Sequence, residues 1–188
     1  MKKIIAVVGD STIEPNGDKY KLAHELGRAL VDAGYRVQTG GRSGIMEAVF
    51  VGAQTSKKYT GNDTIAISPF FDRASANPHA DIVIATGLDI YRNTIVANAD
   101  AVVAIGGGAG TLCEISNAWT MGRMVIGYQN VDGWSAKLAG SPVDHRHRYE
   151  TIPDDMVYPA KTADDVIKHL ATRMPLYNIP YKGLWGKE

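Results

Sequence analysis

The chain is organised around Ile105-Gly106-Gly107-Gly108-Ala109-Gly110-Thr111-Leu112-Cys113-Glu114. An apolar run at residues 101–105 leads into these residues, and a helical pattern from Leu112 to Met121 leads out of them. The pattern predicts a glycine loop that joins a buried strand to the beginning of a helix. Such a loop brings backbone N–H groups and the positive end of a helix dipole to one point, which favours binding of an anion.

Composition limits the class of protein. The 188 residues are 45% apolar and 21% charged, which is typical of one globular domain spanning residues 1–188. Lys and Arg number 20, as do Asp and Glu, and this balance argues against a basic nucleic-acid-binding surface. Cys113 is the only cysteine, which excludes a disulfide framework. No targeting segment or membrane span is evident, so we expect a cytoplasmic protein with no membrane partner.

Apolar patterning predicts alternating strands and helices. Continuous β-branched runs such as residues 4–8 predict strands that are covered on both faces, and apolar stripes at helical spacing predict helices. The predicted strands are 4–8, 35–39, 64–68, 81–86, 101–105 and 124–126, with an edge strand at 157–158; the predicted helices are 18–33, 45–53, 88–99, 112–121 and 162–174. A polar connection at about 128–156 and a C-terminal tail at about 175–188 complete the chain.

This alternation predicts an α/β fold, a doubly wound and mostly parallel Rossmann-like sheet with helices on both faces. With the common strand order 3-2-1-4-5-6, strands one and four are neighbours at the switch point, where ligands bind beyond the carboxyl ends of the strands. We therefore expect Gly9–Ser11, Thr86–Arg92 and the glycine loop to converge, with Gly40-Gly41 beside them.

The glycine loop alone indicates only phosphate or another anion. It lacks the Gly-Lys-Ser/Thr ending of a P-loop and the third glycine of the dinucleotide fingerprint. It also follows the fifth predicted strand, whereas that fingerprint follows the first.

A more specific resemblance spans about residues 4–126. Residues 107–114 resemble the G-G-x-G-T-x-x-E signature of the LOG family, which belongs to the SLOG superfamily. Residues 40–46 resemble the family's second loop, Gly9-Asp10-Ser11 resembles its first loop, and Arg92 resembles the arginine of its M-H-x-R-K segment. The four segments occur in the family's order and at about its spacing.

The resemblance implies a Rossmann-like domain that hydrolyses nucleoside 5′-monophosphates to a free base and ribose 5-phosphate. Arg92 and Glu114 would be the catalytic pair, because a carboxylate can stabilise an oxocarbenium-like transition state and an arginine fork can hold phosphate or ribose oxygens. No cofactor is required, and LOG-like proteins are typically homodimers or larger. The expected ligand-binding residues are Gly9, Ser11, Gly40, Gly41, Asn93, Gly107, Gly108, Ala109, Gly110 and Thr111.

Two departures point to a sister branch of the same superfamily. Gly106 stands where LOG enzymes have proline, and Asn93 stands where they have lysine. The pattern is closer to the branch that includes molybdenum-cofactor carriers, which present a phosphate-bearing pterin without cleaving it. The sequence therefore supports two hypotheses, a phosphoribohydrolase and a non-catalytic carrier.

Several residues also have simpler interpretations. Residues 111–114 read T-x-x-E, a capping box in which Glu114 would bond only to the backbone at the helix start. Arg92 lies off the apolar stripe of Leu88, Tyr91 and Ile95, which is compatible with a surface position. The Gly40 loop is equally compatible with a tight turn.

The remaining features give weaker signals. Cys113 lacks a nearby histidine and is not expected to be a nucleophile. His145 and His147 alternate in a polar segment but lack a third ligand at a recognisable spacing, so we predict no metal site and expect a solvated loop or a cap over the ligand. Trp134 is suited to stacking on a base or to packing. The tail aromatics, Tyr177, Tyr181 and Trp185, suggest a subunit contact.

Overall fold

A computed structural model describes residues 1–177 of the chain. Seven parallel strands form one sheet in these residues. The strands are β1 (Ile4–Gly9), β2 (Arg36–Thr39), β3 (Thr64–Ser68), β4 (Ile82–Ala85), β5 (Ala101–Ile105), β6 (Met124–Tyr128) and β7 (Val157–Ala160). The α-helices are α1 (Asp18–Asp32), α2 (Ile45–Gln54), α3 (Asn93–Ala97), α4 (Ala109–Thr120), α5 (Trp134–Leu138) and α6 (Ala163–Thr172), and the 3-10 helices are η1 (Arg73–Ser75), η2 (Asp89–Arg92) and η3 (Met174–Leu176).

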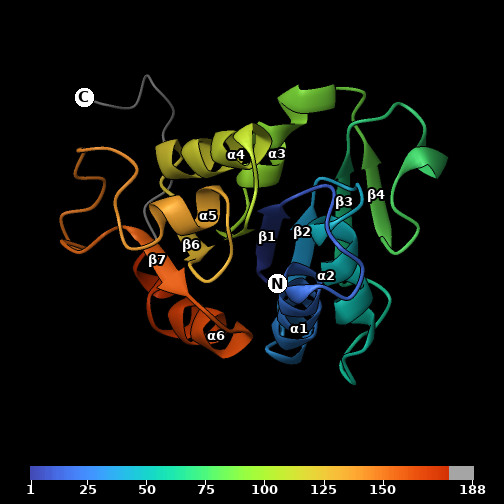
Figure 1. Cartoon of the computed structure of the whole chain (residues 1–188), viewed down its shortest axis with the longest axis horizontal. Coiled ribbons are helices and arrows are strands. Elements are labelled where there is room, and N and C mark those ends of the chain that lie inside the picture. Colours follow the sequence, from blue (N-terminus) through green and yellow to red (C-terminus); the bar gives the residue numbers. More distant parts are fainter. Residues whose placement is uncertain (178–188) are drawn as a thin grey trace.

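The strands run in the order β4-β3-β2-β1-β5-β6-β7. Helices α1, α2 and α6 cover one face of the sheet, and α3, α4 and α5 cover the other, as Figure 1 shows. Alternate residues of one strand therefore enter two separate cores: Val103 and Ile105 lie in the first, and Val102 and Ala104 lie in the second. This confirms the predicted doubly wound fold, because only a sheet covered on both faces buries every residue of a strand.

The predicted strand order is wrong at one position. Strand β1 pairs with β5, not with β4, and β4 pairs with β3 at the edge of the sheet. The chain adds β2, β3 and β4 on one side of β1 before it crosses back to begin β5 on the other side. The switch point therefore lies between β1 and β5, and the return segment, residues 86–100, crosses the sheet.

This return segment also corrects a predicted helix. Residues 88–99 form the short 3-10 helix η2 followed by the single-turn helix α3, not one continuous helix. Gly87 and Asp89 have φ values of +63° and +47°, which interrupt helical geometry at its beginning. Likewise, the polar connection at 128–156 is not wholly irregular, because β6 extends to Tyr128 and α5 lies within it.

None of the helices in the described part of the chain has the length and apolar character needed to cross a membrane.

Candidate functional site

The glycine loop lies at the switch point between β5 and α4. Gly106 and Gly107 have φ values of +67° and +95°, which favour glycine and turn the chain sharply out of the strand. Helix α4 begins at Ala109 with Gly108 as its N-cap, and no side chain caps it. The first backbone bond of the helix runs from Leu112 N to Gly108 O, so the preceding N–H groups remain available to a ligand.

The loop is held from behind by the beginning of α5. The backbone N–H groups of Trp134 and Ser135 donate to the carbonyls of Gly107 and Gly106 over 2.9 and 3.0 Å. Gly106 N donates to Ser135 Oγ over 2.8 Å, and this hydroxyl donates in turn to Tyr128 O. Ser135 is fully buried, so these bonds fix the loop without solvent exchange. Nothing in the sequence alone distinguished Ser135 from other serines of the polar connection.

The capping-box interpretation of residues 111–114 is wrong. The N-cap is Gly108, which places Thr111 in the first helical turn and Glu114 in the second. Both side chains are buried, with 4% and 8% of their surface exposed. They therefore face inward from the helix, and Glu114 has no capping role.

An open pocket of ≈350 Å³ lies over the loop. It brings together the ends of β1, β2 and β5 with the return segment, and this agrees with the general position of ligand sites in open α/β sheets. Its lining residues are Val8, Gly9, Asp10, Ser11, Gly40, Arg42, Met46, Ile90, Arg92, Asn93, Gly108, Gly110, Thr111 and Glu114.

Three of the predicted ligand-binding residues lie beside this pocket without lining it. A Cβ on Gly107 would meet the Thr111 side chain at 2.3 Å, and a Cβ on Gly41 would meet Ala66 at 3.0 Å. These glycines therefore allow close approach between protein segments. Ala109 also does not line the pocket, although it opens α4 between two glycines that do.

The loops after β1 and β2 are joined to each other. Ile45 N donates to Asp10 O over 2.9 Å, and Ser43 Oγ donates to Ser11 O over 2.8 Å. Gly44 lies so close that a Cβ there would be 2.3 Å from Asp10 O. The Gly40 segment is therefore more than an isolated tight turn, because it forms one wall with the first loop.

Arg92 is buried, contrary to the surface interpretation. Its Nε donates to the carbonyls of Gly40 and Ile67 over 3.1 and 3.0 Å, and its Nη1 donates to Asp89 O over 2.8 Å. A Cβ on Gly40 would lie 2.7 Å from Nη2. The guanidinium is thus fixed by backbone groups, and these bonds leave Nη2 for a ligand in the pocket.

Glu114 shares this pocket with Arg92. Burial raises the pKa of Glu114 to about 7, and the positive charge of Arg92 opposes the shift. Arg92 and Glu114 do not form an ion pair in the described part of the chain. A buried carboxyl and a buried guanidinium therefore both line one pocket without neutralising each other by direct contact.

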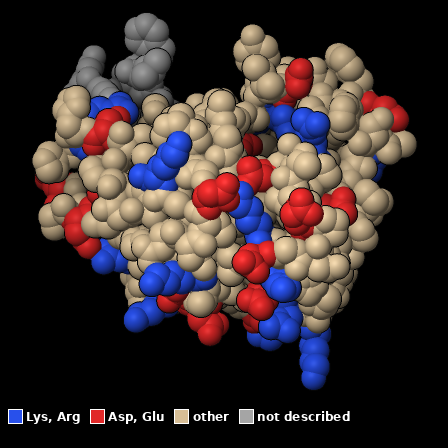
Figure 2. Space-filling model, in the orientation of Figure 1, with Lys and Arg blue, Asp and Glu red and all other residues tan. Residues whose placement is uncertain are grey.

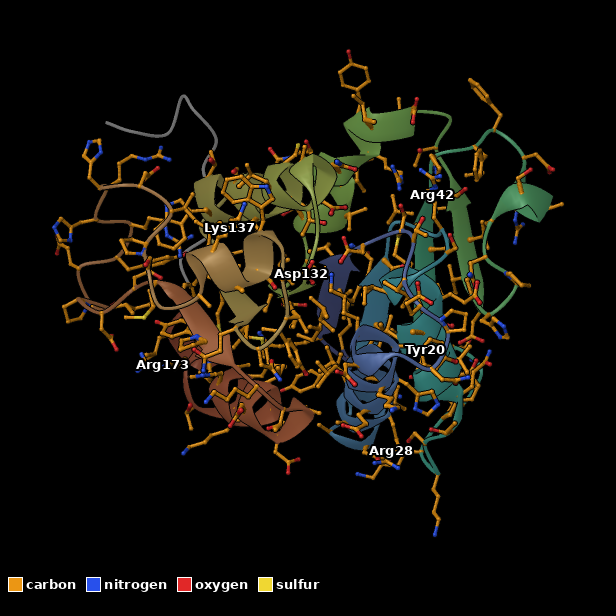
Figure 3. The ribbon with its side chains drawn as sticks, viewed as in Figure 1. Tyr20, Arg28, Arg42, Asp132, Lys137 and Arg173 are labelled. Atoms are coloured by element: carbon orange, nitrogen blue, oxygen red, sulfur yellow. The ribbon has the colours of Figure 1, made fainter. Side chains whose placement is uncertain are left out.

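Asn93, a predicted ligand-binding residue, lines the pocket, and its Nδ2 lies 3.5 Å from Gly110 O, which links α3 to the glycine loop. A further group beside the site, Lys19, did not stand out in the sequence. On the other side of the loop, Lys19 Nζ bridges Asp10 and Asp132 at 2.5 and 2.7 Å. In Figure 3, Asp132 lies near the centre of the view and Arg42 lies toward its upper right.

The His/Arg cluster at 144–148 lies outside the pocket. Arg146 pairs with Asp144, and Arg148 pairs with Asp155. His145 and His147 are exposed, and the described residues contain no His/Cys/Asp/Glu group suited to a metal ion. The exposed histidines agree with the predicted solvated loop, and this segment does not cover the pocket of its own chain.

Two aromatic predictions can be placed. Trp134 does not line the pocket, and Lys137 Nζ lies 4.7 Å from its ring centroid. Tyr177 is not an exposed contact, because its hydroxyl donates to Asp155 and its ring packs against Tyr149. Tyr181 and Trp185 lie outside the described residues.

Comparison with known proteins identifies relatives of this architecture. A profile of the SLOG cluster4 family matches residues 2–157. An uncharacterized protein from Archaeoglobus fulgidus is 34% identical over 122 residues, which are 64% of this chain and 76% of that protein. The crystal structure of TM1055 matches with a TM-score of 0.76 and 30% identity over 90% of this chain and 98% of its own. A molybdenum cofactor binding protein from the bacterium Rippkaea orientalis matches with a TM-score of 0.72 and 28% identity over 91% and 96% of the two chains.

Proposed function

The chain belongs to the SLOG cluster4 family, and from this premise we propose that it binds a phosphorylated heterocycle and carries it without cleavage. The leading candidate is the molybdenum cofactor, a phosphate-bearing pterin. The observation that carries the proposal is the pairing, in one pocket, of an uncapped glycine-rich helix start with a fixed arginine and a buried carboxyl.

The phosphate end is supported by the beginning of α4. Cβ atoms built on Gly108 and Gly110 meet nothing within 4 Å, so these glycines leave backbone N–H groups bare on the pocket side. The helix dipole favours negative charge at this point, and Thr111 adds a hydroxyl on the same wall.

The heterocycle end is supported by Glu114 and Arg92. A carboxylate accepts two hydrogen bonds side by side, which suits the adjacent N–H groups of an aminopyrimidinone ring such as that of a pterin. The fixed guanidinium of Arg92 suits an oxygen or a second anionic group. Figure 2 shows basic and acidic side chains interspersed over the viewed face with no broad basic area. This face therefore suits a small ligand in the pocket better than a long anionic polymer.

Gly106 favours the carrier branch over the hydrolase branch. Its φ of +67° is outside the range of proline, and its N–H donates to Ser135 Oγ. The proline that LOG enzymes carry at this position is therefore incompatible with this loop. The protein described as a molybdenum cofactor binding protein from Rippkaea orientalis shares 28% identity with the chain.

A nucleoside 5′-monophosphate phosphoribohydrolase is the second candidate. The favouring observation is the buried carboxyl of Glu114 with a pKa of about 7, which suits proton transfer near neutral pH. In this reaction water would add to C1′ of the ribose, the C1′–N bond would break, and the base would leave with a proton. The products would be free base and ribose 5-phosphate.

The first experiment tests the phosphate site. We expect AMP to raise the thermal midpoint of the protein and adenosine to leave it unchanged, because binding to the folded state stabilises it. The variant Thr111→Val should weaken the AMP effect, and Thr111→Ser, which keeps the hydroxyl, should preserve it. Equal stabilisation by AMP and adenosine would contradict a phosphate site at α4.

The second experiment separates carrier from hydrolase. Freshly purified protein should contain pterin fluorescence and molybdenum, and it should slow oxidation of added cofactor. Incubation with AMP should release no adenine. Release of adenine by the unaltered protein, abolished in Glu114→Gln, would instead establish the hydrolase; absence of pterin, molybdenum and protection would exclude the carrier.

A further inference from the structure

The charged side chains that line the pocket are unequally partnered. They are Asp10, Arg42, Arg92 and Glu114. Each of the two acidic groups is compensated by a nearby cation or by a proton. Neither guanidinium forms an ion pair with a carboxylate in residues 1–177. The pocket therefore has an excess of positive charge.

The charge of Asp10 is compensated from outside the pocket. Lys19 Nζ lies 2.5 Å from Asp10 Oδ2, and Lys19 itself does not line the pocket. Gly106 makes room for this pair, because a Cβ there would lie 2.3 Å from Asp10 Oδ2 and 2.8 Å from Lys19 Nζ. The second partner of Lys19, Asp132, has a side chain that is 89% exposed. The pair thus removes one negative charge from the pocket and adds no basic group to its wall.

The charge of Glu114 is reduced by burial. Burial raises the pKa of this carboxyl to about 7, so a large part of it carries a proton near neutral pH. Apart from the pair of Asp10 and Lys19, the pocket therefore holds less than one full negative charge against the charges of two arginines.

Arg42 has a fixed backbone and a free side chain. Asn77 N donates to Gly41 O, and Asn77 Nδ2 donates to Arg42 O, both over 3.1 Å. Asn77 is buried, so these bonds hold the loop after β2 firmly in place. Arg42 is nevertheless exposed, and its guanidinium remains available to a group in the pocket.

The guanidinium groups of Arg42 and Arg92 lie close enough to repel each other. Burial lowers the pKa of Arg92, and the positive charge of Arg42 lowers it further, although Glu114 and Asp89 act in the opposite direction. Arg92 Nη2 lies against Gly40, two residues before Arg42 in the same loop. An anionic group between the two arginines removes this repulsion and accepts hydrogen bonds from both guanidinium groups.

This second anion position is separate from the beginning of α4. Helix α4 follows β5, whereas the carbonyls that hold Arg92 belong to Gly40, just beyond β2, and to Ile67 in β3. Strand β1 lies between β5 and β2, so two strand spacings, roughly 10 Å, separate the two positions. The phosphates of a diphosphate share one bridging oxygen and are too close together to reach both.

We propose that the pocket selects a phosphorylated heterocycle with a second anionic group on the side of the ring away from the phosphate, and that Arg42 is the residue that selects it. The phosphate binds the beginning of α4, and the second group, such as a carboxylate, binds between Arg42 and Arg92. This inference rests on the phosphate-binding function proposed above and adds a charge requirement to the ligand. A ligand with one phosphate alone leaves the two guanidinium groups facing each other.

Calorimetry with AMP and adenylosuccinate tests the proposal. Adenylosuccinate is AMP with two carboxylates attached through the adenine amino group, so it has anionic groups at both ends. We expect it to bind about tenfold more tightly than AMP, because a hydrogen bond between charged groups contributes at least that factor. ADP, whose second charge adjoins the first, should show no such gain. Higher salt should reduce the gain, since Arg42 is exposed.

Variants of Arg42 identify the residue responsible. Arg42→Met should abolish the gain and leave AMP affinity within about twofold, because the phosphate lies beyond a Debye length from the removed charge. Arg42→Lys keeps the charge and should retain part of the gain. Arg73→Met is the matched control, at an exposed arginine that does not line the pocket, and should preserve both affinities.

Four outcomes would overturn the proposal. Equal or weaker binding of adenylosuccinate would exclude the second anion position, while AMP binding would leave the phosphate site intact. A gain that persists in folded Arg42→Met would assign selection to another residue. Equal loss of both ligands in that variant would place Arg42 at the phosphate. Failure of the unaltered protein to bind either ligand would contradict the phosphate-binding function itself, and this inference with it.

Discussion

Two arginine–carboxyl neighbourhoods differ in how their charges are partnered. The side chains of Arg148 and Asp155 are 7% and 8% exposed, and two bonds of 2.7 and 2.8 Å join them. Arg148 also donates to the carbonyls of Trp119 and Arg123 at the end of α4, and its guanidinium lies 3.5 Å from the Trp119 ring centroid. Every polar group of this neighbourhood has a partner within the protein.

Arg92 and Glu114 are also buried, but no ion pair joins them in residues 1–177. Arg92 is fixed by carbonyls, and Glu114 lines the pocket as a partly neutralised carboxyl. The difference shows that burial alone does not identify a functional charge. A charge paired within the protein stabilises the fold, and one left facing a pocket is available to a ligand.

The largest expected loss of stability follows from breaking the ion pair between Arg148 and Asp155. Arg148→Met should lower the free energy of unfolding by about 3–5 kcal/mol, because it leaves the Asp155 carboxylate buried without its partner. Urea denaturation measures this loss. Arg146→Met, in the exposed pair with Asp144 of the same segment, should cost less than ~1 kcal/mol. Equal losses in the two variants would remove the distinction between paired and surface arginines.

The neighbourhood of Arg92 and Glu114 should instead lower the stability of the protein when Glu114 is ionised. Glu114 keeps its proton in the native state up to a pKa of about 7, whereas the unfolded carboxyl loses it near 4.5, so the native state binds more protons between these values. Stability should therefore fall as pH rises from about 5 to 8, by up to ~3 kcal/mol.

Glu114→Gln should remove that part of the pH dependence and stabilise the protein at pH 8, as measured by urea denaturation at each pH. Glu150→Gln, at an exposed residue, is the control and should preserve the slope. A Glu114→Gln variant that is less stable at pH 8 would indicate a carboxylate with a partner, like Asp155.

A smaller loss of stability is expected when the hydrogen bond between Ser135 and the glycine loop is removed. Ser135→Ala removes the acceptor for Gly106 N–H and should cost ~1–3 kcal/mol, because a buried donor loses its partner. Ser141→Ala, at an exposed residue, should be within ~0.5 kcal/mol of the unaltered protein. Thermal denaturation compares the two, and a neutral Ser135→Ala would show that α5 does not support the loop.

The smallest stability effect is expected at the proposed phosphate position. Gly110→Ala places a methyl group where nothing lies within 4 Å, in the first turn of α4, so stability should stay constant or rise by up to ~1 kcal/mol. AMP binding should nevertheless weaken by about tenfold, or ~1.4 kcal/mol, as measured by calorimetry. Unchanged AMP affinity in the folded variant would show that the bare helix start is not the binding surface.

The sequence predicted much of the fold because burial on both faces of a sheet imposes continuous apolar runs. The runs at 64–68 and 101–105 agree with β3 and β5 residue for residue. The glycine run likewise indicated a strand-to-helix loop, since glycine adopts the positive φ values found at Gly106 and Gly107 more readily than other residues.

Helical periodicity shows which residues share one side of a helix, but it does not show what packs against that side. The prediction failed for this reason in the return segment. The stripe of Leu88, Tyr91 and Ile95 was interpreted as the inward side of a helix, and the structure leaves all three residues exposed. The alternative interpretation of Arg92 as a surface residue is also wrong, because Arg92 is buried. The outward position of the stripe follows from the edge position of β4, because residues 1–177 place no further layer above it. Strand order depends on contacts between distant segments, and local pattern contains no record of them.

The sequence by itself determined the alternation of strands and helices, the glycine loop and the residue types available for binding, because these depend on local conformation and on side-chain chemistry. Tertiary structure decided which of these residues meet. It placed Glu114 in the pocket rather than at a helix cap, gave Arg92 backbone partners and paired Arg148 with Asp155. The partners of Arg92 and Arg148 are not adjacent to them in the chain, so the adjacent residues do not determine them. The position of Glu114 depends on where α4 begins, which is at Gly108 and not at Thr111.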